Sequence, residues 1–171
     1  SIYKREVGKS VIQNMLNQAN RYVYMMSPYL IVDNELRQAI EDAALRGVNV
    51  KLILPHIPDK KLVYEMARSH YQRLMDAGVE IYEYEPGFVH AKVYLADDEY
   101  AMVGTINLDY RSLVHNFENG VWMYRCDCLK DIEQDFAETL EKCIRIDESK
   151  IKWSLMQRFV RSVVKVFTPM L

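Results

Sequence analysis

Hydrophobic and polar positions along the chain follow two alternating spacings, one typical of helices and one typical of strands. Apolar residues at three- and four-residue spacing predict helices at 10–19, 34–46, 60–77 and 129–144. Shorter apolar runs between turn-forming residues predict strands at 22–30, 48–54, 79–84, 88–96, 99–103 and 120–124. Because helices and strands alternate through short connections, we expect an α/β fold, a mixed β-sheet flanked by helices.

Local sequence signals set the expected ends of the helices. Ser10 followed by Gln13 fits a capping box at the start of the first helix. Asp33 is a good N-cap for the second helix, because its carboxylate can accept a backbone N–H of the first turn. Gly47 and Gly78 are expected to end the second and third helices. The last helix is expected to bury one face formed by Ile132, Phe136, Leu140 and Cys143.

Composition and charge place the chain among ordinary globular domains. Its 171 residues, 50% hydrophobic and 27% charged, fit a single domain with its own core. The formal net charge of −2 argues against a dedicated nucleic-acid binder, which would usually be basic. Cys126, Cys128 and Cys143 are odd in number and lack zinc-ligand spacing, so neither a disulfide framework nor a metal site is expected. A soft metal at the Cys-x-Cys pair is the alternative.

The segment 150–171 differs in charge from the rest of the chain. It carries no acidic residue and five basic ones, Lys150, Lys152, Arg158, Arg161 and Lys165. Apolar residues recur between them at helical spacing, which predicts a basic amphipathic helix that lies on an anionic membrane surface or packs against protein. No apolar run approaches the roughly 20 residues of a membrane span. The chain opens on Ser1 without an initiating Met, so we expect a piece of a longer protein.

Reactive side chains first appear in the predicted strand 88–96, at His90 and Lys92. Side chains alternate faces along a strand, so His90, Lys92 and Tyr94 are expected on one face. A neutral imidazole is abundant near pH 7 and can attack phosphorus. A lysine ammonium is a compact charge with several donors and can hold a phosphate. Taken alone, the pair is more simply explained as two residues on a half-exposed strand.

The segment 104–107, with the sequence Gly-Thr-Ile-Asn, adds groups that suit a phosphate. A glycine at position 104 lets a phosphate approach the backbone closely. The hydroxyl of Thr105 and the carboxamide of Asn107 are neutral donors that can stabilise developing negative charge. The segment therefore strengthens the phosphate-binding interpretation of His90 and Lys92.

The spacing of these residues is far more specific than either segment alone. It is His-x-Lys, four residues, Asp, six residues and Gly-Thr-x-Asn, formed by His90, Lys92, Asp97, Gly104, Thr105 and Asn107. The pattern resembles the HKD motif of the phospholipase D superfamily and matches it completely, with Thr105 where many members have Ser. Flanking stretches resemble cardiolipin synthases, among them Ser27-Pro28-Tyr29, Tyr82-Glu83-Tyr84, Pro86-Gly87-Phe88 and Asn116-Phe117-Glu118. Arg125 departs from those relatives, which often carry an acidic residue there.

The resemblance implies a role for each residue of the motif. In this superfamily two halves face each other, each with one histidine, one lysine and one asparagine. One histidine attacks phosphorus and the other protonates the leaving alcohol. The implied catalytic residues are His90, Lys92, Asn107 and Glu118, with Lys92, Thr105 and Asn107 on the substrate phosphate. Glu118 is expected to hydrogen-bond the imidazole, Asp97 and Gly104 to give structural support, and no metal or cofactor is implied.

The implied architecture is a phospholipase D-like half domain at 1–149, with one HKD motif, followed by the amphipathic helix at 150–171. The implied reaction joins two phosphatidylglycerol molecules into cardiolipin and glycerol through a phosphohistidine. An N-terminal HKD half of the same protein, or a second copy in a dimer, would complete the site. We expect the full-length protein at the bacterial cell membrane, and this fragment to be soluble or peripheral. The alternatives are a single-motif homodimeric phosphodiesterase or nuclease, and an inactive isolated half.

Overall fold

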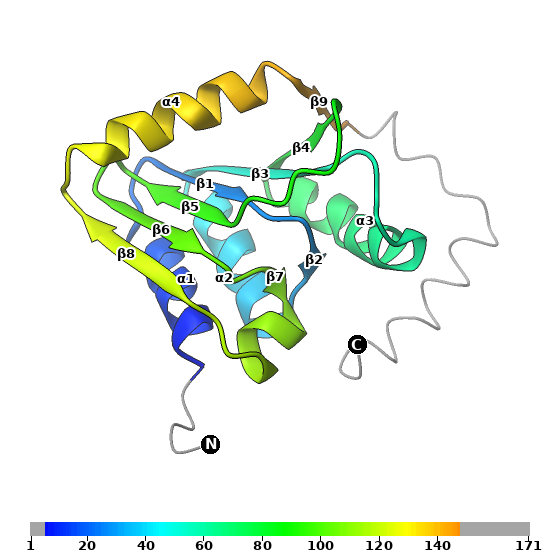
Figure 1. Cartoon of the computed structure of the whole chain (residues 1–171), viewed down its shortest axis with the longest axis horizontal. Helices are drawn as coiled ribbons and strands as arrows, with labels where there is room; N and C mark the ends of the chain where they lie inside the picture. Colours follow the sequence, from blue (N-terminus) through cyan, green and yellow to red (C-terminus); the bar gives the residue numbers. More distant parts are fainter. Residues whose placement is uncertain (1–5, 148–171) are drawn as a thin grey trace.

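A seven-stranded mixed sheet is the centre of the fold in the computed structural model, which describes residues 6–147 (Figure 1). Its strands follow the order β8 (Gly120–Tyr124), β6 (Tyr100–Gly104), β5 (Val93–Ala96), β1 (Tyr22–Met26), β3 (Asn49–Pro55), β4 (Glu80–Tyr84) and β9 (Cys143–Arg145). β1, β3 and β4 are parallel, and the remaining neighbours are antiparallel. A second, two-stranded sheet pairs β2 (Leu30–Ile31) with β7 (Leu108–Asp109). The predicted α/β fold with a mixed sheet flanked by helices is confirmed.

Hydrophobic cores lie on both faces of the large sheet. One is formed with α1 (Val7–Gln18), α2 (Asn34–Leu45) and α3 (Lys61–Asp76), and the other with α4 (Cys128–Leu140). The alternation of strand side chains divides β1 and β3 between them: Met25 and Leu52 belong to the first core, and Met26 and Ile53 to the second. Because both faces of these strands are covered, their sequences are continuously apolar over several residues.

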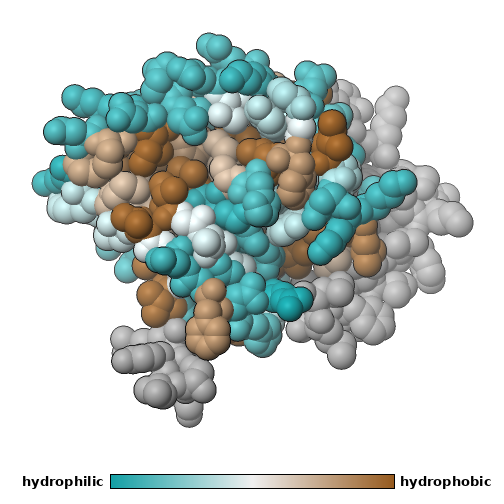
Figure 2. All heavy atoms as spheres, in the orientation of Figure 1, coloured by the Kyte–Doolittle hydropathy of each residue, from teal (hydrophilic) through white to brown (hydrophobic). Residues whose placement is uncertain are grey.

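The face that carries α4 has a marked contrast in polarity. The outward side of α4 is polar, and apolar side chains gather over the strands beside the helix (Figure 2). On the edge strand β8, Val121, Trp122 and Tyr124 are exposed. Trp122 and Tyr124 pack on Tyr100, with ring centroids 5.6 and 5.1 Å apart. Exposed apolar side chains on a sheet edge suit contact with further protein.

Helix caps follow the sequence signals at some ends and depart from them at others. The Asp33 cap is confirmed, since its carboxylate accepts the N–H of Leu36 at 2.9 Å. Gly47 and Gly78 follow α2 and α3 with φ angles of 91° and 98°. The capping box at Ser10 is wrong: α1 begins at Val7, and the Ser10 N–H already donates to Glu6 within the helix.

The last predicted helix is also too long. α4 ends at Leu140, and Cys143 lies in β9, which pairs antiparallel with β4 at the sheet edge. The side chain of Cys143 still packs into the core beneath α4. Its position facing the core was therefore predicted correctly, whereas the helical spacing assigned to it was wrong. The predicted amphipathic helix at 150–171, and with it the boundary after residue 149, lies outside the described residues. Within residues 6–147, no helix has the length and hydrophobicity needed to cross a bilayer.

Candidate active site

His90 and Lys92 lie before β5 and not on it. The predicted strand 88–96 is regular only from Val93, because its neighbour β1 ends at Met26, which is paired with Val93. The side chains of residues 88–92 therefore do not have to alternate between two faces as they would in a strand. His90 is exposed, whereas Lys92 is only 8% exposed, and the ammonium of Lys92 donates to the carbonyl of His90 at 2.6 Å. Tyr94, the third residue expected on the same face, is buried and donates to the carbonyl of Ile106 at 2.8 Å.

The amine of Lys92 sits in an environment that is unusual for a lysine. Burial lowers its pKa from the ordinary value, while the nearby carboxylates of Glu118 and Asp109 oppose that shift by favouring the charged form. A positive charge held in a poorly solvated place interacts more strongly with an anion than the same charge in water. Lys92 is therefore well suited to neutralise a phosphoryl group.

Glu118 forms the centre of a hydrogen-bond cluster beside Lys92. Its carboxylate accepts from the side chains of Thr105, Ser112 at 2.8 Å and Asn116 at 3.1 Å. Burial alone would raise the pKa of this carboxyl, but these hydrogen bonds and the attraction of Lys92 lower it below its ordinary value. Glu118 is thus held ionised next to the lysine.

Among the residues that the structure describes, Glu118 does not form the expected hydrogen bond with the His90 imidazole. Among residues 6–147, the oxygens of Glu118 are engaged by the donors of its own loop and of the 104–107 segment. The His90 ring instead lies beside Phe88, with ring centroids 5.7 Å apart. The carboxylate of Glu118 is thus hydrogen-bonded to neighbouring donors and acts on Lys92 through its charge, whereas the sequence had predicted a hydrogen bond to His90.

Asn107 keeps unused hydrogen-bonding capacity in its side chain. Its backbone N–H donates to the hydroxyl of Ser112 at 2.9 Å, which fixes the segment next to Glu118. Within the part of the chain that the structure describes, the buried side-chain oxygen of Asn107 has no hydrogen-bond partner. A buried polar group without a partner is uncommon in folded proteins, and a bound ligand is one way to satisfy it.

Gly104 is required by a close approach of two strands. A Cβ at this position would lie 2.1 Å from the carbonyl oxygen of Asn119 and 2.6 Å from the Cα of Gly120. Gly104 and Gly120 are direct partners in the β6–β8 pairing. The absence of a side chain therefore serves the packing of β6 against β8.

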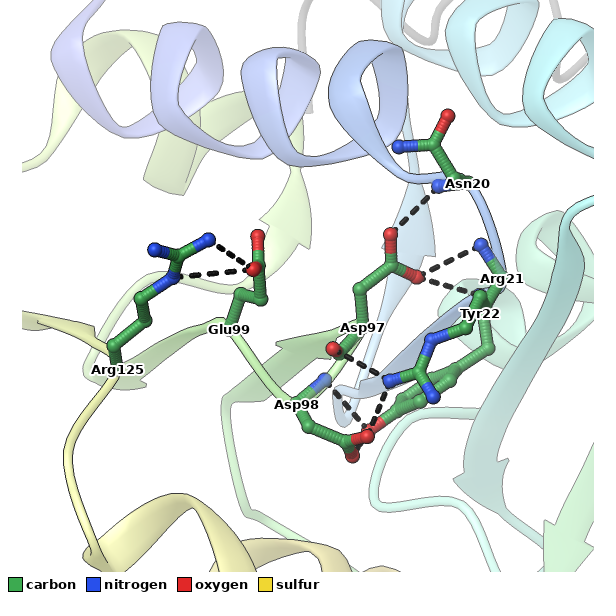
Figure 3. A network of polar contacts seen from close by, with 7 residues as sticks. All are labelled: Asn20, Arg21, Tyr22, Asp97, Asp98, Glu99 and Arg125. Carbon is green, nitrogen blue, oxygen red and sulfur yellow. Dashed lines mark hydrogen bonds and ion pairs between the residues drawn. The ribbon is translucent and has the colours of Figure 1, made fainter.

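Asp97 lies at the opposite end of β5 from His90 and Lys92. Its carboxylate accepts three backbone N–H groups, those of Asn20, Arg21 and Tyr22, at 2.7 to 2.9 Å (Figure 3). Asp97 itself has a φ of 56°, in the left-handed region that aspartate tolerates better than most residues. These contacts tie the β5–β6 turn to the start of β1 and support a structural role for Asp97.

Arg125, which departs from the cardiolipin synthase pattern, belongs to the same end of the sheet. Its guanidinium pairs with the carboxylate of Glu99 at 2.5 Å, and its backbone N–H donates to the carbonyl of Glu99 at 2.8 Å (Figure 3). The Arg125 side chain is exposed to solvent and that of Glu99 is partly exposed. The substitution therefore lies away from the motif residues that precede β5.

Sequence reasoning missed two serines that hold the site together. The hydroxyl of Ser27 accepts the N–H of Leu108 at 3.0 Å and donates to the carbonyl of Tyr29 at 2.9 Å. Ser112 links Asn107 to Glu118 from the π-helix η1 (Arg111–His115). Ser27 stands in a stretch that resembles cardiolipin synthases, which was the available signal, but nothing in the spacing of either serine showed what it would bind.

The fold of this chain is shared with a solved structure of the phospholipase D family. It is similar to the structure of Nuc, a phospholipase D family member from Salmonella typhimurium, with a TM-score of 0.72 and 15% sequence identity. The match covers 82% of this chain and 91% of that one. At such low identity the similarity concerns the fold alone, which is that of the phospholipase D family.

The sequence comparison narrows this class. The family model "Cardiolipin synthase, PLD-like domain" matches residues 12–140, and the chain belongs to this family. An uncharacterized protein of Streptococcus mutans is 52% identical over 97% of this chain and 36% of its own length. Cardiolipin synthase 2 of Bacillus anthracis is 38% identical over 98% of this chain and 33% of its own length. The chain thus spans about a third of the length of these relatives.

Proposed function

We propose that this chain is one half of the active site of a cardiolipin synthase and corresponds to its C-terminal catalytic half. The observation that carries the proposal is the exposed imidazole of His90 on a residue whose backbone carbonyl accepts the poorly solvated ammonium of Lys92, in a chain of this family. The reaction would transfer a phosphatidyl group from one phosphatidylglycerol to a second one, with release of glycerol. The relatives named cardiolipin synthase support this reaction.

The proposed chemistry has two displacement steps at phosphorus. In the first, one histidine attacks phosphorus and the bond from phosphorus to the oxygen of the head-group glycerol breaks. The other histidine donates a proton to that oxygen, so that glycerol leaves. In the second, the terminal hydroxyl of another phosphatidylglycerol gives its proton to that second histidine and attacks the phosphohistidine. The phosphorus–nitrogen bond then breaks and cardiolipin leaves. His90 would take either role.

The remaining site residues would stabilise charge on the phosphoryl oxygens. Lys92 supplies a positive charge, while Asn107 and Thr105 supply neutral hydrogen-bonding groups next to it. Glu118 would keep Lys92 protonated and oriented, since the two carry opposite charges and interact across the site. Asp97 and Gly104 would act further away, by fixing the β5–β6 turn and the β6–β8 pairing.

The proposed partners are a second HKD half and a membrane. An N-terminal HKD half of the same protein, or a second copy of this chain, would bring the other histidine, lysine and asparagine. The basic, apolar segment 150–171 would hold the protein at an anionic bilayer, where its substrate resides. The full-length protein would accordingly work at the bacterial cell membrane.

The proposal is tested by His90→Ala in the full-length protein that contains this chain, with phosphatidylglycerol as the substrate. Formation of cardiolipin, followed by mass spectrometry, should fall by about a hundredfold or more, as expected for loss of a nucleophile or a general acid. His115→Ala, the same change at another exposed histidine, should leave the rate within about twofold. An unchanged rate in the His90 variant would remove this residue from the mechanism.

A second candidate function is a phosphodiesterase formed by two copies of the chain. The similarity to Nuc favours it, because that match covers nearly all of a chain of comparable size. The net charge of −2 argues against a nucleic-acid substrate. Hydrolysis of DNA by a dimer of this chain, without formation of cardiolipin by the full-length protein, would decide for this alternative.

A further inference from the structure

Three sulfur atoms converge where the edge strand β8 meets helix α4. The thiols of Cys126 and Cys128 lie 2.7 Å apart, and the thiol of Cys128 lies 3.6 Å from the thioether sulfur of Met123. Met123 stands on β8, Cys126 in the connection, and Cys128 at the first residue of α4. The spacing of the cysteines alone did not favour a metal site, and the third sulfur, from Met123, is what the structure adds.

The backbone between β8 and α4 brings these sulfurs together by contacts of its own. Arg125 has a φ of 48°, so the chain turns sharply after β8. The backbone N–H of Arg125 donates to the carbonyl of Glu99 at 2.8 Å, and the N–H of Leu129 donates to the carbonyl of Cys126 at 3.2 Å. Because hydrogen bonds of the main chain fix this turn, a ligand that binds all three sulfurs does not first have to order the chain.

The surroundings of the sulfurs favour a bound cation over a free thiolate. Met123 and Cys126 are half-buried and pack against the core beneath α4, whereas Cys128 is exposed. The hydrogen bond with Cys126 is the main cause that raises the pKa of the Cys128 thiol, and the carboxylate of Asp131 raises it further. A metal cation can displace the thiol proton, and a nearby carboxylate that disfavours a free thiolate attracts such a cation.

The donors are all sulfur, and this selects the metal. Within residues 6–147, no three side chains of histidine, cysteine, aspartate or glutamate lie together in a way that could hold a metal ion. A structural zinc site normally has four such ligands, and magnesium and calcium need oxygen. Cu(I) is a soft ion that thiolate and thioether ligands select, and two or three of them satisfy it. The guanidinium of Arg125 is paired with Glu99, so its charge is partly neutralised (Figure 3).

We propose that Met123, Cys126 and Cys128 form a three-coordinate site for one Cu(I) ion. On binding, the ion forms bonds to both cysteine sulfurs and to the thioether, and the two thiol protons leave to solvent. With three metal–sulfur bonds of about 2.3 Å at equal angles, the sulfurs would stand roughly 4 Å apart. Cys128 and Met123 are already close to that separation, and the exposed side chain of Cys128 can rotate away from Cys126 to reach it.

The copper site is separate from the proposed reaction at His90. The turn that carries the cysteines is attached to Glu99, next to the β5–β6 turn, whereas His90 precedes the other end of β5. The inference therefore goes beyond the proposed function and stands or falls without it.

The test is a competition for Cu(I) between the reduced chain and the chromophoric chelator bathocuproine disulfonate, in the absence of oxygen. The chain should hold one Cu(I) per molecule. Cys128→Ser should lower its affinity about a hundredfold or more and Met123→Leu about tenfold, because a thiolate binds Cu(I) more strongly than a neutral thioether. Cys143→Ser and Met75→Leu make the same changes outside the site and should keep the affinity within about twofold. Thermal unfolding of each metal-free variant identifies any folding defect.

X-ray absorption at the copper edge identifies the ligands directly. It should show three sulfur neighbours at about 2.3 Å in the unaltered chain and two in Met123→Leu. The site is overturned if Cys128→Ser binds Cu(I) as tightly as Cys143→Ser does, if one ion is shared by two chains, or if Zn(II) binds more tightly than Cu(I) in the same titration. A reduced chain that holds no Cu(I), and whose Cys126 and Cys128 form a disulfide in air, would identify a redox pair in place of a metal site.

Discussion

Lys92 and Glu118 show how single side chains prepare this site for an anion. The lysine loses hydration on burial, which disfavours its charge, and the carboxylate restores part of that loss. Glu118 can do so because three side-chain donors keep it ionised. The two residues are therefore coupled, and the protonation of one depends on the charge of the other.

This coupling predicts a shift in the pH dependence of Glu118→Gln. Removing the negative charge leaves burial to lower the pKa of Lys92 further, so the lysine loses its proton at a lower pH than before. In the full-length protein, the alkaline limb of the kcat/KM profile for phosphatidylglycerol should move to lower pH. Glu99→Gln, at a carboxylate paired with Arg125 on the surface, should leave the limb in place. Equal shifts in both variants would contradict the coupling.

The residue scale is also where the sequence was most informative. The motif spacing singled out His90, Lys92 and Asn107, and the structure places Lys92 and Asn107 around the cluster of Glu118, Thr105 and Ser112. Burial could not be predicted in the same way. That Lys92 is covered while His90 is exposed depends on residues far away in sequence, which no spacing rule contains.

At the scale of elements, the β5–β6 hairpin organises the site. Its open end carries the segment 90–92 and the segment 104–107, and its turn carries Asp97 and Asp98, both with φ near 60°. The turn is attached to the start of β1 by Asp97, and the open end approaches β8 through Gly104. The hairpin is thus fixed at both ends, so its register against β1 cannot slip.

Asp97→Ala should lower the free energy of unfolding of this chain by about 2 to 4 kcal/mol. The change removes the acceptor of three backbone N–H groups, each bond contributing about 1 kcal/mol. Asp98→Ala is the matched control, because Asp98 also has a positive φ and its carboxylate binds only the side chains of Arg21 and Tyr22. Urea unfolding followed by circular dichroism measures both. A loss in Asp98→Ala as large as in Asp97→Ala would contradict this role.

Element types were more predictable from the sequence than element ends. The regular apolar spacing gave the four helices and most strands of the described chain, and Asp33 marked the start of α2. The strand predicted at 88–96 begins only at Val93, and the helix predicted at 129–144 ends already at Leu140. Both were predicted too long because the extra residues are apolar and the sequence does not show where a neighbouring strand ends or begins. Pairing between distant strands decides those ends.

At the scale of the whole molecule, the chain holds one histidine, one lysine and one asparagine of a site that needs two of each under the proposed mechanism. The edge strand β8 exposes Val121, Trp122 and Tyr124, and it follows shortly after Glu118 in the chain. Since the chain spans about a third of its relatives' length, further protein is available in them to cover such a surface.

The isolated chain is accordingly expected to be a monomer without cardiolipin synthase activity. Light scattering after gel filtration gives its mass, and the same sample is assayed with phosphatidylglycerol. Turnover should be at least about a thousandfold below that of the full-length protein, since a general acid or a nucleophile is missing. A dimer that turns over would show that two copies of His90 can form a working site, which favours the second candidate function.

The position of the motif within one hairpin also has a consequence for how the protein folds. All motif residues from His90 to Asn107 come from one continuous stretch, joined by a tight turn at Asp97. Closing such a short loop costs little chain entropy, and hairpins form within about 1–10 μs, whereas pairing of β1 with β3 must wait for a whole helix between them. The reactive groups of this half can therefore assemble locally, before the parallel strands beside them have found their order.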